Sequence, residues 1–442
     1  MSLVGTRRSS RLGRLAHHLT GARSDYDDLL ARVGEARVTL IGEASHGTHE
    51  FYRERIRLTQ RLIEDRHVTV VAIEGDWPDA YRVNRYVLGL SDDANANDAL
   101  GGFHRFPTWM WRNRDVLDFV EWLREFNHHR PPADQVRFYG LDLYSLGASI
   151  EAVVDYLEGV DPVAAHRARE RYACFDHVGA EGQAYGYSLA TGRSDDCEDE
   201  VVAQLLELRE NSPTYLAHDG NAAQDEQFYA EQNARLVHNA ETYYREMYRA
   251  DVSSWNLRDR HMAGTLEAIL AHFDRRWPPT RAVVWAHNSH VGDARTTDMA
   301  QRGEVNIGQL ARERYGNDAF LIGMTTYAGE VTAASTWGGP TERKRVRPAR
   351  PRSHEAKFHE AGVGDAWFTS AELANEEDAY LERAIGVIYR PDTELQSHYF
   401  HARLAAQFDA LIHIERTSAL IPLETTALWD CGEPAETFPS GL

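Results

Sequence analysis

Short apolar runs that end in a polar or charged residue constrain the fold of this sequence more than any other feature. The runs cover residues 38–41, 68–73, 136–141, 282–286, 319–323, 384–389 and 408–413. They are rich in β-branched residues and nearly continuous, which is typical of strands buried on both faces. Helical patterns at 50–65 and 114–127 separate the first runs. This alternation predicts an α/β fold with a mostly parallel central sheet flanked by helices.

The middle of the chain has a different pattern. Residues from about 149 to 273 show helical periodicity and little strand signal, most clearly at 226–249 and 256–273. We interpret this segment as a helical insertion, or cap, beside the sheet, and we expect a loop at 180–199, which is rich in Gly, Ser and acidic residues. No Pro- or Ser-rich linker requires a split, so residues 1–442 are predicted to form a single domain.

Composition narrows the functional class. A net charge of -20 argues against nucleic-acid binding, which needs a basic surface. No apolar stretch has the length of a signal peptide or a membrane span, so we expect a cytoplasmic protein with no membrane partner. Cys174, Cys197 and Cys431 are far apart and form no CxxC pair. We therefore expect neither a disulfide framework nor a Cys-rich zinc site.

Polar side chains follow four of the predicted strands. Glu43, Glu74, Asp142 and His287 each come directly after a strand or two residues beyond it. Any one such acid is often a helix cap or a turn residue. In an open α/β sheet, however, ligands bind at the carboxyl ends of the strands, where these side chains would converge.

His46 is the predicted base. It follows Glu43 by three residues, where a helix should begin, and the positive end of the helix dipole disfavours an extra proton on the ring. A second pair, His287 and His290, lies at another strand end. A histidine of near-neutral pKa can deprotonate water while a carboxylate orients it, so this set predicts a hydrolytic site.

Five stretches resemble the erythromycin esterase family, over nearly the whole chain from about residue 38 to 421. They lie at 40–51 (LIGEASHGTHEF), 73–76 (IEGD), 138–142 (FYGLD), 256–263 (NLRDRHMA) and 285–290 (WAHNSH). The first motif alone is moderately specific, whereas all five in this order are strongly specific. The best-known members of the family open a macrolide ring and confer antibiotic resistance.

The resemblance implies a hydrolase of ester or lactone bonds that acts on a small molecule without a metal or other cofactor. The matching residues give His46 as general base, with Glu43, Glu74, Arg55 and His287 in the same catalytic site. Either Arg55 or His287 would stabilise the oxyanion.

Further residues are candidates for substrate binding. His290 matches another histidine of the family, and Asp142 and Arg258 lie in matching stretches. Trp109 belongs either to an apolar pocket or to the core. His354 and His359 are about one helical turn apart, a spacing with which His354 could reach the cleft. Arg343 lies in a basic segment, 341–348, interpreted as a solvated loop; the alternative is that this loop faces the cleft and holds an anionic group.

Two other functional classes stay open at this point. The same His and Glu residues are competent zinc ligands, so a zinc-dependent hydrolase is one alternative, although the spacing matches no zinc signature. A non-catalytic small-molecule-binding accessory protein is the other. The joint presence of a base and two glutamates argues against it.

Overall fold

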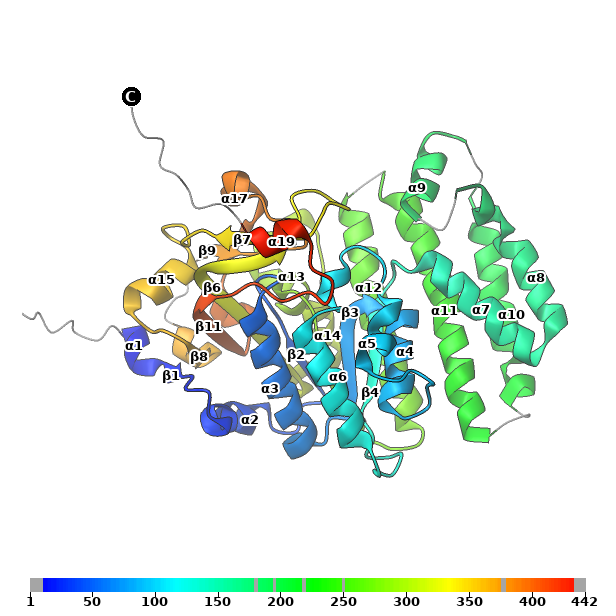
Figure 1. Cartoon of the computed structure of the whole chain (residues 1–442), viewed down its shortest axis with the longest axis horizontal. Helices are drawn as coiled ribbons and strands as arrows, with labels where there is room; N and C mark the ends of the chain where they lie inside the picture. Colours follow the sequence, from blue (N-terminus) through cyan, green and yellow to red (C-terminus); the bar gives the residue numbers. More distant parts are fainter. Residues whose placement is uncertain are drawn as a thin grey trace, which may run out of the picture.

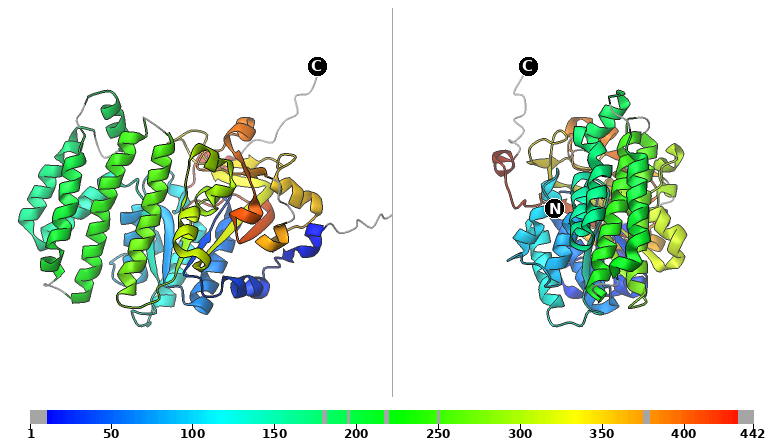
Figure 2. Two further views of the ribbon diagram at one scale, coloured as in Figure 1. Left: turned by 180° about the vertical axis from the view of Figure 1, so that it is seen from behind. Right: turned by 90° about the vertical axis from the view of Figure 1, so that its right-hand side faces the viewer.

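A nine-stranded, mostly parallel sheet with helices on both faces forms the body of the protein, and a helical lobe extends from one end (Figures 1 and 2). The computed structural model describes residues 11–178, 182–193, 196–216, 220–248, 251–374 and 379–432. The predicted α/β fold class is confirmed.

The sheet has the strand order β1-β8-β11-β6-β2-β5-β3-β4, with β7 paired to β6. The six strands from β11 to β4 in this order run parallel, whereas β1, β7 and β8 are antiparallel to their neighbours. A separate ribbon joins β9 and β10. The strands are β1 His17–His18, β2 Val38–Ile41, β3 Val70–Asp76, β4 Arg137–Asp142, β5 Ala282–Trp285, β6 Ala319–Ala333, β7 Glu342–Val346, β8 Ala366–Thr369, β9 Tyr380–Arg383, β10 Tyr399–Ala402 and β11 Ala410–Thr417.

Strand side chains alternate between two apolar layers, as the period of two requires. Val284 belongs to the apolar layer that also contains residues of α12, α14 and α15, and its neighbours Val283 and Trp285 belong to the layer that contains residues of α3 and α6. Outside the helical lobe the helices are α1 Arg11–Leu15, α2 Asp27–Val33, α3 His49–Arg66, α4 Trp77–Val87, α5 Ala96–Ala99, α6 Arg114–Asn127, α13 Asn288–Val291, α14 Ile307–Tyr315, α15 His354–Ala361, α16 Ser370–Leu373, α17 Glu394–Ser397, α18 Leu404–Gln407 and α19 Ala427–Cys431.

Six of the seven predicted strands form, but the run at 384–389 is not a strand. It makes only isolated bridges, from Ile385 to Ser45 and from Ile388 to Ala334. Ile385 and Tyr389 are nevertheless fully buried in a small cluster with the end of β6. The run is therefore apolar because it packs over a strand end, and burial alone does not distinguish such a segment from a strand.

The helical lobe contains the predicted cap. Its helices are α7 Leu146–Val160, α8 Pro162–Tyr172, α9 Gly182–Ala190, α10 Glu198–Leu216, α11 Gly220–Glu246 and α12 Asp251–Asp274. The loop expected at 180–199 is wrong over 182–190, which is α9. Tyr185 of this helix is buried, so packing against the lobe outweighs the Gly- and Ser-rich composition.

The expectation about cysteines is also wrong, because Cys174 and Cys197 form a disulfide across 23 residues of sequence. Cys174 lies just after α8 and Cys197 just before α10, and their Cα atoms are 6.0 Å apart. No short spacing in the sequence reveals this pair, since the helix packing creates it. Cys431 is free and exposed.

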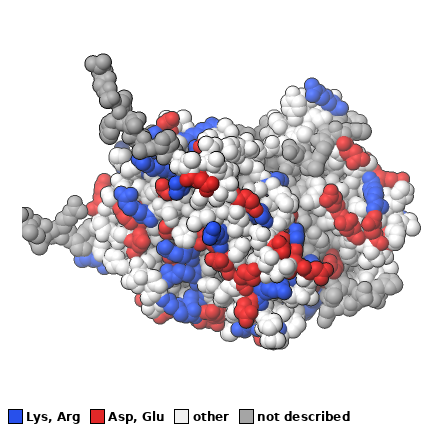
Figure 3. All heavy atoms as spheres, in the orientation of Figure 1, with Lys and Arg blue, Asp and Glu red and all other residues white. Residues whose placement is uncertain are grey.

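No helix within the described ranges is both long and apolar enough to cross a membrane. The face shown in Figure 3 carries acidic and basic side chains interspersed rather than a field of one sign.

Candidate active site

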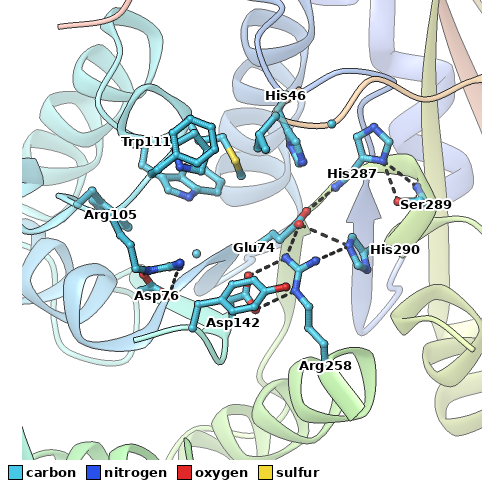
Figure 4. A pocket seen from close by; sticks show the side chains of 18 of the residues that line it. His46, Glu74, Asp76, Arg105, Trp111, Asp142, Arg258, His287, Ser289 and His290 are labelled. Atoms are coloured by element: carbon cyan, nitrogen blue, oxygen red, sulfur yellow. Dashed lines mark hydrogen bonds and ion pairs between the residues drawn. The ribbon is translucent and has the colours of Figure 1, made fainter. Parts of the chain in front are cut away.

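Four neighbouring strands deliver polar side chains to one edge of the sheet. In the order β2-β5-β3-β4, they contribute His46 after β2, His287 after β5, Glu74 within β3 and Asp142 at the last residue of β4. These four side chains line a cavity of about 330 Å³ (Figure 4). Three of the four side chains predicted to converge, Glu74, Asp142 and His287, therefore line one cavity, whereas Glu43 does not. Strands β3 and β4 extend further than expected and include Glu74 and Asp142.

The loop that carries His46 is fixed by its neighbours. The His46 N–H donates to the Ile385 carbonyl at 3.3 Å, and Gly47 accepts hydrogen bonds from the backbone N–H groups of Thr332 and Leu420. A Cβ atom on Gly47 would overlap the Thr332 carbonyl, so only glycine fits this approach.

Glu43 and Arg55 lie behind His46 rather than in the cavity. His46 Nδ1 is 3.0 Å from Glu43 Oε1. Because a carboxylate only accepts hydrogen bonds, the proton is on Nδ1 and the Nε2 lone pair stays available. Arg55, fully buried over the rings of Tyr52 and Trp285, holds the other Glu43 oxygen at 3.1 Å. This arrangement orients the base from behind.

His287 has the opposite proton assignment. Its Nδ1 accepts from the Ser289 N–H at 3.2 Å and lies 2.8 Å from Ser289 Oγ, so Nε2 carries the proton. Nε2 makes no hydrogen bond of ordinary geometry, although the Ala44 carbonyl lies close enough to favour the protonated ring. Burial and the neighbouring His46 lower the pKa of His287 to about 3, although Glu74 and the Ala44 carbonyl act in the other direction. His287 is thus a neutral donor at physiological pH, beside His46 with a ring separation of 4.9 Å.

Glu74 is the centre of a buried ion network. It accepts from the His287 N–H at 2.9 Å and from Arg258 Nη2 at 2.7 Å, and it faces His290 Nε2 at 3.4 Å. Burial raises the pKa of Glu74, but His290, Arg258 and His46 outweigh burial and hold it well below its usual range. Arg258 also forms a bidentate pair with Asp142, at 3.0 and 2.7 Å.

Asp259 supports His290 from the opposite side. Its carboxylate oxygens lie 2.9 and 3.0 Å from His290 Nδ1, and it accepts from the Ile307 N–H. Burial lowers the pKa of His290, but Asp259 and Glu74 raise it by more, so the net direction is upward.

The cavity continues into a region of acidic and aromatic side chains, and the charged residues of this region are not among the predicted site residues. Arg105 forms a bidentate pair with Asp76 at 2.9 and 3.0 Å. Asp79, in the first turn of α4, also faces the cavity, and burial and then the Asp76 carboxylate raise its pKa to about 8. Asp76 belongs to a motif already quoted, so its position after the strand was a usable signal. Asp79 and Arg105 had none, because they reach the site through the packing of α4 and the 103–107 segment.

Besides Glu43 and Arg55, three further predicted residues lie away from this cavity. Trp109 is buried in the core, while its neighbours Met110 and Trp111 line the cavity. His354 is buried at the start of α15, 2.8 Å from the Ala402 carbonyl. Arg343 belongs to strand β7 rather than a loop and lies over the Trp429 ring.

Within the ranges that the structure describes, no three His, Cys, Asp or Glu side chains are arranged to hold a metal ion.

A family model, a curated relative and a solved structure point to the same family. The model of the erythromycin esterase family matches residues 63–417. Erythromycin esterase type II from Escherichia coli is 22% identical over 415 residues, covering 89% of this chain and 93% of that protein. A crystal structure of a Bacillus cereus protein has a TM-score of 0.76 at 20% identity, covering 93% of this chain and 98% of the other. A mutant erythromycin esterase in its open conformation has a TM-score of 0.67 at 16% identity, covering 95% and 99%. At these identities the solved structures show the fold.

Proposed function

Since this chain belongs to the erythromycin esterase family, we propose that it hydrolyses an ester or lactone by attack of a water molecule that His46 activates. Family membership supports an esterase-type hydrolase. The observation that carries the mechanism is the contact of 3.0 Å between His46 Nδ1 and Glu43, which leaves Nε2 as the proton acceptor beside the cavity.

The hydrolysis proceeds in two steps. Nε2 of His46 takes a proton as the water oxygen bonds to the acyl carbon, and His46 becomes an imidazolium that Glu43 stabilises. The tetrahedral intermediate then expels the alcohol oxygen, which receives the same proton from His46. The products are a carboxylic acid and an alcohol, which stay joined in one molecule when the substrate is a lactone.

His287 is the better candidate for stabilising the oxyanion. Its Nε2–H group makes no hydrogen bond of ordinary geometry, and the neutral ring can donate this proton without giving it up. Arg55 is fully buried and already holds Glu43, so it acts by positioning.

Ser289 is a poor nucleophile despite its contact with His287. A histidine with a pKa of about 3 has little basicity at neutral pH, so it does not activate the hydroxyl. Ser45 is similarly occupied, since its hydroxyl contacts that of Thr48. These arrangements favour direct attack by water over an acyl-enzyme.

The test is a screen of macrolides and small esters, anionic ones included, against the wild type and His46→Asn. We expect ring opening or ester cleavage by the wild type and a loss in kcat of roughly 10²–10⁴-fold in the variant. The two proteins should unfold at the same temperature. Full activity in His46→Asn would overturn the mechanism.

Two further experiments test the alternative functions, a zinc-dependent hydrolase and a non-catalytic binding protein. Activity that a chelator abolishes and zinc restores would identify a zinc-dependent hydrolase. Wild-type protein that binds a ligand tightly in calorimetry without any turnover would identify a binding protein. Either result contradicts the proposal.

A further inference from the structure

An exposed tryptophan stands at the edge of the cavity. Trp337 lines the cavity yet leaves 52% of its surface exposed, although large aromatic side chains are usually buried. Its ring meets Phe106 edge to face, with the centroids 5.1 Å apart. These two rings come from distant parts of the sequence and together form part of the cavity rim.

Trp337 is held on a tight turn. The Gly339 N–H donates to the Thr336 carbonyl at 3.0 Å, and Gly338 adopts a φ of +68°, which a side chain would disfavour. The backbone therefore presents the indole at the tip between β6 and β7.

The base of this turn is tied to the rest of the site. Lys344 Nζ donates to Ser335 Oγ at 2.6 Å. The Ala334 N–H donates to the Val387 carbonyl at 2.9 Å, and Val387 also lines the cavity. A fixed base with an exposed ring at its tip is suited to contact a ligand without rearrangement.

The size of the cavity indicates what that ligand is. A volume of about 330 Å³ is near the lower end for ligand pockets. A bulky ester or lactone exceeds a pocket of this size and is therefore only partly enclosed. The remainder of such a substrate leaves the cavity past its rim, where Trp337 and Phe106 stand.

We propose that Trp337 determines specificity by packing its indole against an apolar ring or ring face in the part of the substrate that extends beyond the cavity. A short alkyl ester, which ends inside the cavity, would then gain nothing from the indole. This inference rests on the proposed function, because the reacting bond must lie beside His46.

The experiment compares Trp337→Ala and Trp337→Phe on three esters: ethyl acetate, 2-naphthylmethyl acetate and ethyl 2-naphthylacetate. The second ester carries the naphthyl ring on the alcohol side of the reacting bond, and the third carries it on the acyl side. We expect Trp337→Ala to raise KM about tenfold for the ring-bearing ester that the wild type prefers, with kcat little changed. The KM for ethyl acetate should change by less than about twofold in Trp337→Ala, and Trp337→Phe should keep most of the affinity for the ring-bearing ester.

Leu428→Ala is the matched control, because Leu428 is 54% exposed on α19 and does not line the cavity. An equal loss for all three esters in Trp337→Ala, or a change confined to kcat, would overturn the proposal. The second result would instead indicate a gate.

A binding measurement separates this inference from the proposed function. Calorimetry with the two ketone isosteres of the naphthyl esters, which cannot be hydrolysed, gives Kd without turnover. A higher Kd in Trp337→Ala than in the wild type supports the proposal even if the wild type cleaves no ester. An unchanged Kd, or no binding by the wild type, overturns it.

Discussion

His46 and His287 are adjacent rings whose hydrogen bonds place the proton on different nitrogens. Glu43 accepts a hydrogen bond from the Nδ1–H group of His46, whereas the Ser289 N–H donates to Nδ1 of His287. One ring therefore offers a lone pair and the other an N–H group. A single neutral tautomer could not serve both roles, so the neighbours of each ring assign its function.

The first prediction concerns the pH dependence of catalysis. With a pKa of about 3, His287 stays neutral from pH 5 to 9 and contributes no limb to the rate profile. His287→Ala should lower kcat by roughly 10²–10³-fold, the effect of losing one oxyanion donor, and leave the acidic limb of kcat/KM in place. A pH–rate profile of both proteins checks this, and a shift of that limb would show that His287 itself titrates.

Glu382 gives a second prediction, on stability. Burial and then Glu355 raise its pKa from 4.5 to about 8, so the folded protein holds a proton that the unfolded chain releases. Its stabilising contribution is complete below about pH 4.5 and is lost as the pH rises to 8. The slope is up to about 1.4 kcal/mol per pH unit.

Glu382→Gln mimics the protonated acid and keeps the contact with Asn288 through an amide oxygen. The stability of the variant relative to the wild type should therefore increase from pH 5 to pH 8 in urea unfolding. Glu360→Gln, on the exposed side of α15, is the control. A difference that is constant with pH would refute the assignment.

At the scale of elements, the sequence predicted those strands and helices whose formation depends on residues adjacent in the chain. β2 and α6 form with the predicted bounds. A continuous β-branched run and a capped amphipathic helix can both be recognised from residues that are adjacent in the chain. The same pattern placed Glu74, Asp142 and His287 at one edge. It could not reveal Asp79, Arg105 or the Cys174–Cys197 pair, which meet only through packing of distant segments.

The loop between β2 and α3 gives the third prediction. Because a Cβ on Gly47 would overlap the Thr332 carbonyl, Gly47→Ala must move either β6 or the His46 loop. We expect a loss of about 1–3 kcal/mol in unfolding free energy, as for overpacking, together with a lower kcat. Gly159→Ala is the control, since its Cβ meets open space in α7 and a helix favours alanine. Equal stabilities for the two variants would contradict this account.

The disulfide gives the fourth prediction. Closing a loop of 23 residues stabilises the folded lobe by about 3 kcal/mol in the chain-entropy model. Replacing both Cys174 and Cys197 by serine should raise hydrogen exchange in α8 and α10, while exchange in β2 and β5 stays protected. Unchanged exchange in α8 and α10 would show that helix packing alone holds them.

At the scale of the whole molecule, the cavity is a junction between the sheet and the helical lobe. Strand ends supply the histidines and carboxylates, whereas α12 supplies Arg258 and Trp255 (Figures 1 and 4). Because Arg258 is paired with Asp142 and Glu74, the site and the interface between the two parts share the same ion network.

The last prediction tests this coupling. Arg258→Met leaves Asp142 and Glu74 as buried charges without their partner, which should cost about 3–5 kcal/mol, and Asp142→Asn removes part of that penalty. A double-mutant cycle by urea unfolding should therefore give a large interaction energy, whereas the surface pair Arg302 and Glu304 should give about 0–1 kcal/mol. If the Arg258 and Asp142 effects are additive, the pair does not couple the lobe to the sheet. If they interact strongly, and exchange in α12 rises in Arg258→Met, the pair that shapes the site also holds the lobe against it.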